Sequence, residues 1–195
     1  MKQVEGYVER ITYRNEDNGY SVIYLSNPEP KADEDDEVCC VGFFSFVSEG
    51  EYLVINGRET VHKSYGPQIQ VESYETKRPS SQVAIEKYLG SGAIKGIGAA
   101  LAARIVRRFG EKTFEIIENE PERLAEIKGI SMKMAVSVAK QFNDKRQMRQ
   151  SVIFLQEYGI SVNMAVKIYK FYGEKIYEIM QQNPYRLAED IAGIG

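Results

Sequence analysis

The sequence contains no tryptophan, one histidine and two cysteines in 195 residues. Cys39 and Cys40 are adjacent in a segment that alternates like a strand, so their side chains point to opposite faces and are badly placed for a disulfide. Two cysteines are also too few for a metal site. His62 has no acid–base partner in view. We therefore expect reduced thiols, as in a cytoplasmic protein, and neither a metal site nor catalytic residues.

Long apolar runs and nucleotide-binding strings are also missing. No apolar run approaches the roughly 18 residues that cross a membrane, and the N-terminal MKQVEGYVER lacks the apolar core of a signal peptide. No G-x-x-x-x-G-K-[ST] string occurs, and Leu101 stands where the third glycine of a dinucleotide fingerprint would follow Gly96 and Gly98. We therefore expect no membrane partner, no bound cofactor and no small-molecule substrate for this chain.

Charge is distributed unevenly along the chain. Residues 1–76 contain 6 Lys and Arg against 15 Asp and Glu, a net charge of −9, whereas residues 77–195 contain 19 against 13, a net charge of +6. The change in sign occurs at TKRPSS, a typical linker composition. It predicts two domains, 1–76 and 77–195, and makes the second the candidate for contact with nucleic acid.

The first domain reads as short strands. Asn18-Gly19 favours a type I′ turn between two β-rich runs, and further strands fit 37–44, 51–62 and 67–75. Between them, the acidic, proline-rich segment from Asn27 to Glu37 predicts a loop. Five strands in about 75 residues predict a small closed barrel of the OB or SH3-like kind.

Aromatic side chains are frequent in this predicted barrel, at Tyr7, Tyr13, Tyr20, Tyr24, Phe43, Phe44 and Tyr52. Such residues can form a platform on which single-stranded nucleic acid stacks. Alternatively, they fill the barrel and its docking face. The net charge of −9 favours the second interpretation, because it repels phosphates.

The second domain contains an internal repeat. Residues 96–131 align with 159–195 at an offset of 63 until one extra residue, Asp190, enters the second copy. Ten of eighteen positions are identical between 109–126 and 172–189. The repeated unit is a helix, a glycine turn and a second helix. We number the four turns hairpin 1 (95–98), hairpin 2 (128–131), hairpin 3 (158–161) and hairpin 4 (192–195). Hairpin 4 ends the sequence, so we expect its unit to be truncated.

The hairpins have a simple physical basis. Pro121 suits the first turn of a helix, and Gly129 suits the left-handed residue that ends one. Ile130 would then enter the small core between the helices. The free amides at the start of the next helix, with the positive end of the helix dipole, form a site for a phosphate oxygen. The pattern is typical of a helix-hairpin-helix motif, although a glycine hairpin also packs helices where no DNA is bound.

Hairpins 1 and 2 are the candidate DNA-binding elements, because Lys95 and Lys128 directly precede their glycines and cations follow on the next helices. Hairpin 3 has Glu157-Tyr158 and hairpin 4 has Ile191-Ala192 there, which favours a structural role. The candidate site comprises Lys95, Gly96, Ile97, Gly98, Arg104, Arg107, Arg108, Lys128, Gly129, Ile130, Ser131 and Lys133.

The ordered segments NGYSVIYL, YGPQIQV, YLGSGAIKGIGAALAARIVRRFG, PERLAEIKGIS, FLQEYGIS, YKFYG and NPYRLAEDIAGIG resemble the N-terminal region of bacterial RecD-like ATP-dependent DNA helicases. The resemblance covers nearly the whole chain. It implies an α+β architecture, with a small N-terminal barrel followed by an all-α array of tandem helix-hairpin-helix units. In that family two RecA-like motor domains of superfamily 1 follow and unwind DNA from 5′ to 3′ with ATP and Mg²⁺.

The resemblance implies a non-catalytic accessory region of such a helicase, which acts in DNA repair and contacts the DNA backbone without reading sequence. The motor's Walker lysine and magnesium ligand match no position here, so we expect no ATP hydrolysis by this chain. The chain looks like an excised part of a larger helicase. The alternative is a docking module that packs on the missing motor domains or on a partner protein without touching DNA.

Overall fold

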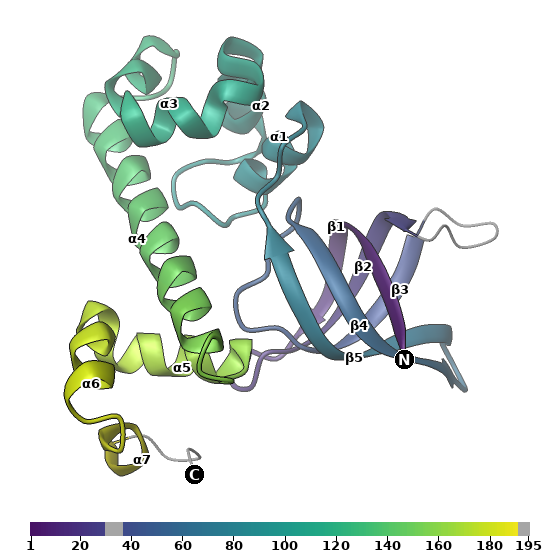
Figure 1. The fold of residues 1–195 in the computed structure, drawn as a ribbon. Coiled ribbons are helices and arrows are strands. Elements are labelled where there is room, and N and C mark those ends of the chain that lie inside the picture. The colour runs from purple at the N-terminus through teal and green to yellow at the C-terminus, as the bar shows by residue number, and fades with distance from the viewer. Residues whose placement is uncertain (30–36, 191–195) are drawn as a thin grey trace. The chain divides into compact units, whose positions relative to one another are not determined.

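The computed structural model describes residues 1–29 and 37–190. A closed barrel of five strands comes first and helices follow it, as the sequence predicts (Figure 1). The chain divides into two compact units, Met1–Phe142 and Asn143–Gly195, with the division inside one long helix. Each unit is described by itself.

The barrel strands are β1 (Lys2–Arg14), β2 (Tyr20–Glu29), β3 (Glu37–Phe43), β4 (Tyr52–His62) and β5 (Gly66–Lys77). Their order around the barrel is β1-β2-β3-β5-β4, and β4 closes it against β1. All neighbours are antiparallel except β3 and β5, which pair in parallel through Cys40 and Ile69. This strand order, in which one parallel pair closes an otherwise antiparallel barrel, is that of an OB-type barrel.

Side chains alternate between the inside and the outside of the barrel. Val8, Ile23, Leu25, Leu53 and Ile55 are fully buried inside. Of the seven aromatic residues noted in the sequence, only Phe44 lies in this core, and Tyr13 and Phe43 are about half exposed. The part of the interpretation that places these aromatic residues inside the barrel is therefore wrong for most of them, because β-branched and leucine side chains occupy the inward positions of their strands. That they form a docking face stays a prediction.

Two local expectations in the barrel are corrected. The β1–β2 connection has five residues, 15–19, in which the Asn15 amide donates to the Tyr20 carbonyl and Asn15 Oδ1 accepts from the Asp17 and Asn18 amides. Gly19 takes a positive φ of 78°, but the last backbone pair is Asn15 with Tyr20, so no two-residue type I′ turn forms across Asn18-Gly19. Strand β2 also continues through Glu29, which pairs with Glu5, into the segment expected to be a loop.

The helical part of the first unit begins after a short linker from Lys77 to Gln82. It comprises α1 (Gln82–Gly90), α2 (Ala99–Phe109), η1 (Gly110–Lys112), α3 (Thr113–Asn119), η2 (Pro121–Glu126) and the first part of α4 (Met132–Gln156). Segment 121–126 was expected to be an α-helix but forms a 3₁₀ helix, as short runs often do. One buried cluster unites these helices, and the rings of Tyr88, Phe114 and Phe142 pack together within it.

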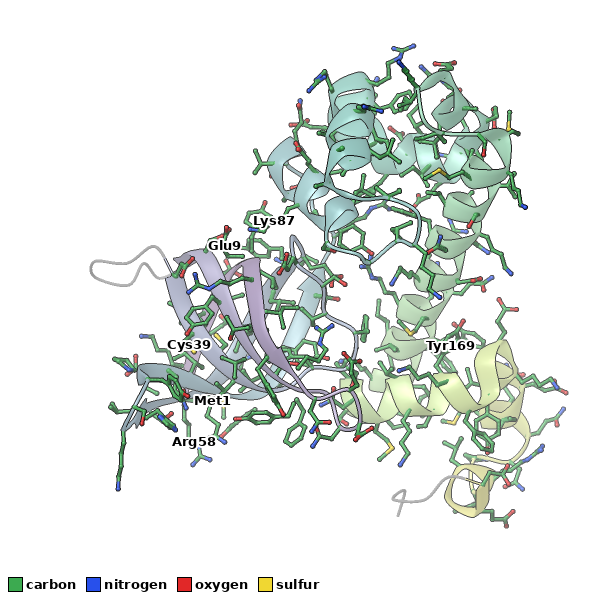
Figure 2. The ribbon with its side chains drawn as sticks, turned by 180° about the vertical axis from the view of Figure 1, so that it is seen from behind. Met1, Glu9, Cys39, Arg58, Lys87 and Tyr169 are labelled. Carbon is green, nitrogen blue, oxygen red and sulfur yellow. The ribbon has the colours of Figure 1, made fainter. Side chains whose placement is uncertain are left out.

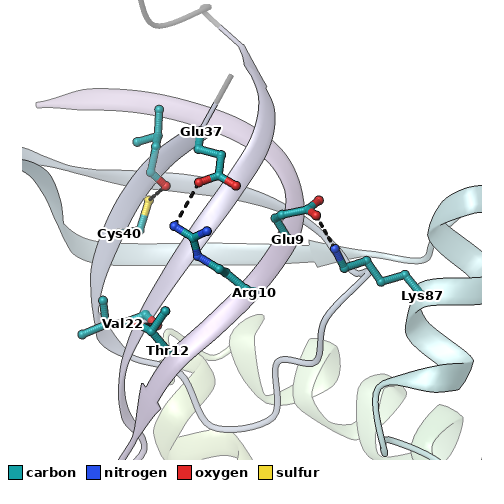
Figure 3. Close-up of polar contacts among 8 residues, drawn as sticks. Glu9, Arg10, Thr12, Val22, Glu37, Cys40 and Lys87 are labelled. Atoms are coloured by element: carbon teal, nitrogen blue, oxygen red, sulfur yellow. Dashed lines mark hydrogen bonds and ion pairs between the residues drawn. The ribbon is translucent and has the colours of Figure 1, made fainter. Parts of the chain in front are cut away.

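The barrel packs directly on α1. A methyl group on Gly50 would lie 2.5 Å from the Tyr88 amide nitrogen and 2.7 Å from the Ala84 carbonyl oxygen. Nearby, Glu9 of β1 and Lys87 of α1 point toward each other and form a 2.6 Å ion pair (Figures 2 and 3). The hydrogen bond with Lys87 lowers the pKa of the Glu9 carboxyl. Barrel and first helices therefore form one compact unit.

The second unit contains the rest of α4, then α5 (Val162–Tyr172), η3 (Gly173–Lys175), α6 (Ile176–Gln182) and α7 (Arg186–Asp190). It repeats the first unit's succession α2, η1, α3. Gly110 and Gly173, 63 residues apart, have nearly the same backbone, with φ of 60° and 61°. The repeat read from the sequence is therefore a structural repeat. Among the described residues, no helix is both long and apolar enough to cross a membrane.

We predict that Gly50→Ala destabilises the chain by about 2–4 kcal/mol, because the new methyl group meets the α1 backbone in addition to the strain of a φ of 87°. Gly66→Ala is the matched control. Its φ is 80° but its surroundings are open, so only the backbone strain of about 1 kcal/mol applies. Urea denaturation of both variants measures the difference, and equal losses of stability would contradict the close approach of α1 to the barrel.

Candidate nucleic-acid interface

Hairpin 1 connects α1 to α2. Gly96 has a φ of 95°, and the Ile97 amide donates to the Ile94 carbonyl at 3.3 Å. Ile97 is buried, while Lys95, Gly96 and Gly98 are exposed. Gly98 is extended and begins α2, since its carbonyl accepts from the Ala102 amide. The hairpin therefore presents backbone to solvent and anchors itself by one isoleucine, as the sequence predicts.

Hairpin 2 repeats this geometry 33 residues later. Gly129 has a φ of 99°, the Ile130 amide donates to the Ile127 carbonyl, and Ile130 is buried. The Ser131 carbonyl accepts from the Ala135 amide, as that of Gly98 does from Ala102. Gly129 takes the expected positive φ, although the preceding 3₁₀ helix has already ended at Glu126.

The two hairpins differ at the start of the helix that follows. Ser131 Oγ accepts a hydrogen bond from the Met134 amide at 3.1 Å, a normal N-terminal cap. Gly98 has no side chain and supplies no such cap. The first amides of an α-helix have no acceptor within the helix. The amides at the start of α2 are therefore open to solvent, where an anion can accept hydrogen bonds from them.

The hairpins face each other through equivalent residues. A methyl group on Gly96 would lie 3.4 Å from Met134 Cε, and one on Gly129 would lie 3.2 Å from Leu101 Cδ2. Leu101 follows Gly96 by five residues, and Met134 follows Gly129 by five. Gly96 thus lies against Met134, and Gly129 lies against Leu101, the residue of the first motif that is equivalent to Met134. This reciprocity indicates a local two-fold relation between the two motifs.

Polar side chains join the two motifs in the same reciprocal way. Gln141 of α4 accepts from the Lys95 amide at 2.8 Å and donates to the Lys95 carbonyl at 3.1 Å. Arg104 of α2 donates to the Lys128 carbonyl at 3.1 Å. The helix that follows each hairpin therefore holds the backbone of the other hairpin at its lysine.

The cations of the candidate site separate into two groups. Arg104 bonds the Lys128 carbonyl, and Arg108 forms a 3.1 Å ion pair with Glu126. Within residues 1–29 and 37–190, the side chains of Lys95, Arg107, Lys128 and Lys133 form no ion pair, and all four are exposed. The second group is thus the one available to an external anion.

Sequence reasoning missed Gln141 because it concentrated on glycines and cations. The signal that could have identified Gln141 was its position within the repeat. Gln141 follows Gly129 by twelve residues, as Arg108 follows Gly96, so the repeat itself marks both as equivalent. Nothing in the residue type, however, distinguishes a glutamine that bonds backbone from one that lies in solvent.

Hairpin 3 has the same backbone but different surroundings. Gly159 has a φ of 80°, and Ser161 Oγ accepts from the Met164 amide. Tyr158 occupies the lysine position and is 59% exposed. A methyl group on Gly159 would meet no atom within 4 Å, so no described motif packs against it as hairpin 2 packs on hairpin 1. Hairpin 4, with Ile191 and Ala192, lies outside the described residues.

The barrel offers less to a phosphate backbone. Arg10 lies over the Tyr24 ring. It also pairs with Glu37, as Figure 3 shows. Cys39 and Cys40 are free thiols, and burial raises the pKa of both. The His62 ring accepts from the Ser64 and Tyr65 amides and so closes the β4–β5 turn. These contacts are explained by the fold.

Comparison with protein families identifies both parts of the chain. Residues 1–79 match the OB-fold domain of the ATP-dependent DNA helicase YrrC. Residues 85–147, and again 144–195, match the helix-hairpin-helix (HHH) domain of the ATP-dependent RecD2 DNA helicase. The double match coincides with the repeat at an offset of 63 residues.

Among individual proteins, the chain is 22% identical over 195 residues to the ATP-dependent RecD2 DNA helicase of Deinococcus radiodurans. The similarity covers 99% of this chain and 27% of that protein, so the chain spans about a quarter of its relative's length. A solved structure of the Schizosaccharomyces pombe Stn1–Ten1 complex matches 39% of this chain and 57% of its own, at 19% identity and a TM-score of 0.30.

We predict that Gly96→Ala destabilises the first unit by about 1–2 kcal/mol, because alanine is strained at a φ of 95°. Gly98→Ala, two residues away, is the control. Its φ is negative and its surroundings are open, so it is expected to be neutral or slightly stabilising. Thermal unfolding followed by circular dichroism compares the two, and a destabilisation at Gly98 as large as that at Gly96 would refute the hairpin geometry.

Proposed function

Since this chain belongs to the RecD2 family of ATP-dependent DNA helicases, we propose that it holds the DNA backbone for the helicase through hairpins 1 and 2. In this proposal residues 1–76 form the barrel domain and residues 77–195 the helix-hairpin-helix domain. The chain contributes no catalytic residue. ATP and Mg²⁺ would act in the motor domains of the whole protein, because no phosphate-binding loop occurs in these 195 residues.

One observation carries the proposal. Two exposed hairpins of equal geometry face each other in one compact unit, and each has an exposed lysine directly before its glycine. Lys95 and Lys128 would pair with phosphates, and the unbonded amides at the starts of α2 and α4 would donate to phosphate oxygens. Arg107 and Lys133 add positive charge on the following helices. Such contacts position a protein on DNA without reading its sequence.

The two-fold relation between the hairpins favours duplex DNA. The backbones of a duplex run antiparallel and are themselves related by local two-fold axes, so two symmetric hairpins can each meet an equivalent phosphate. A single strand would have to be ordered before it could present two phosphates at the same spacing, which costs conformational entropy.

The whole protein would act in the cytoplasm, where bacterial DNA lies.

A docking function is the second candidate, and the barrel is the observation that favours it. Its sequence carries a net charge of −9, and Tyr13 and Phe43 lie about half exposed on its outer side. An acidic surface with exposed aromatic residues suits a protein partner better than a phosphate backbone. On this alternative the hairpins pack helices only, and the barrel contacts the motor domains or another protein.

We predict that Lys95→Glu combined with Lys128→Glu weakens DNA binding roughly 30-fold at low salt, because repulsion replaces the attraction between two cations and their phosphates. Fluorescence anisotropy with a labelled duplex measures the affinity across a salt series. The slope of log affinity against log salt should fall by about one unit for each phosphate that the variant no longer neutralises. Duplexes of unrelated sequence should show the same decrease in affinity.

The matched control is Lys63→Glu with Lys112→Glu. Both lysines are exposed and belong to the same unit, but they lie in the β4–β5 turn and in η1, away from the hairpins. The change in net charge is the same. If both double variants bind DNA equally weakly, generic charge and not the hairpins carries binding. If the wild-type chain binds no DNA at low salt, the docking function is favoured.

We predict that a short blunt duplex competes for the chain roughly ten times better than either of its single strands, because the paired hairpins suit two fixed phosphates. The measurement is competition against the labelled duplex at constant ionic strength, with competitors matched in phosphate concentration. Tighter binding of the single strands would contradict the role of the two-fold pair.

A further inference from the structure

We propose that Gln141 and Arg104 are positioning residues for DNA binding, each of which holds in place the hairpin of the opposite motif. Gln141, on the helix after hairpin 2, would set hairpin 1. Arg104, on the helix after hairpin 1, would set hairpin 2. This inference rests on the proposed function, and it takes Arg104 out of the set of direct phosphate contacts.

The Gln141 side chain is matched to its target. Its amide oxygen accepts from the Lys95 N–H at 2.8 Å, and its amide nitrogen donates to the Lys95 C=O at 3.1 Å, so both backbone groups of one residue are bonded. Ser137, one turn earlier on α4, accepts a further 3.4 Å hydrogen bond from the same nitrogen. The two bonds therefore hold both peptide groups that flank the Lys95 Cα, the second of which joins Lys95 to Gly96.

That peptide lies directly before Gly96, the residue through which the chain reverses. Because the Lys95 amide is already bonded to Gln141, it is not a phosphate donor, and the unbonded amides at the start of α2 and the Lys95 side chain remain for that role. Removal of the Gln141 amide would free the hairpin to move relative to α4. A phosphate that binds would then have to order the hairpin, and the entropy lost in that ordering would lower the affinity for DNA.

Arg104 makes the analogous contact to hairpin 2, although it lies one turn earlier on its helix than the repeat-equivalent of Gln141, which is Arg108. Its guanidinium donates to the Lys128 carbonyl at 3.1 Å and lies against Gly129, where a methyl group would meet it at 3.4 Å. The neighbouring Arg108–Glu126 ion pair joins α2 to the segment just before hairpin 2. Arg104 is thus directed at backbone within the protein, and its charge acts on DNA only from behind the hairpin.

A crossed set of double-mutant cycles tests the proposal. Lys95→Ala and Lys128→Ala are each measured in the wild-type, Gln141→Leu and Arg104→Gln backgrounds, by anisotropy with the same duplex. In the wild-type background each alanine is expected to weaken binding about 5-fold. In Gln141→Leu the effect of Lys95→Ala should shrink to about 1.5-fold while the effect of Lys128→Ala persists. In Arg104→Gln the pattern should reverse.

Controls separate positioning from stability and charge. Gln150→Leu makes the same substitution at an exposed site on α4 and should leave affinity unchanged. Gln141→Glu keeps the acceptor for the Lys95 amide and removes the donor, so it provides a second variant if Gln141→Leu does not fold. It should likewise reduce the effect of Lys95→Ala. All affinities are taken at temperatures where circular dichroism shows each variant folded.

The outcomes are distinguishable. Independent effects in every background would overturn the positioning roles while leaving the proposed function intact. An Arg104→Gln variant with weaker binding and an undiminished effect of Lys128→Ala would make Arg104 a direct phosphate contact. If neither lysine matters in the wild-type background, the proposed function itself fails.

Discussion

The geometry of the hairpins depends on one backbone constraint, the reversal of the chain through a single glycine of positive φ. At Gly96 and Gly129 this angle is 95° and 99°, a conformation in which other residues are strained. The reversal turns the next isoleucine into the core and leaves the residue after it extended, ready to begin a helix. Because the glycines carry no side chain, Leu101 and Met134 can approach them, and the two motifs pack face to face.

Much of this could be predicted from the sequence because it is local or repeated. Alternation of apolar residues revealed the strands, and the change of charge sign fell near the linker between Lys77 and Gln82. The glycine hairpins were recognisable because only certain residue types tolerate each position: glycine at the reversal, isoleucine behind it, serine or glycine before the helix. The repeat at an offset of 63 residues then strengthened this interpretation, because the same pattern of residues occurs in more than one copy.

The features that escaped prediction depend on contacts between distant residues. Arg104, Arg107 and Arg108 look alike in sequence and all are exposed, yet the first bonds a carbonyl and the third pairs with Glu126, whereas Arg107 forms no ion pair with the described residues. Gln141 reaches a residue 46 positions away. In the barrel, strand alternation placed most aromatic residues outward against the expectation from their size. Local patterns identify elements, but the partners of long polar side chains follow from tertiary packing.

The uncapped start of α2 connects folding with binding. Ser131 and Ser161 complete their helices from within the chain, whereas Gly98 leaves that hydrogen bond unmade. Glycine is poorer than serine as an N-cap by only about 0.3 kcal/mol, so the start of α2 is slightly less stabilised than the helix starts after hairpins 2 and 3. An anion bound at the start of α2 would accept hydrogen bonds from the same amides and so supply the missing bond. By thermodynamic linkage, an anion that binds hairpin 1 in the folded state would also raise the melting temperature of the unit.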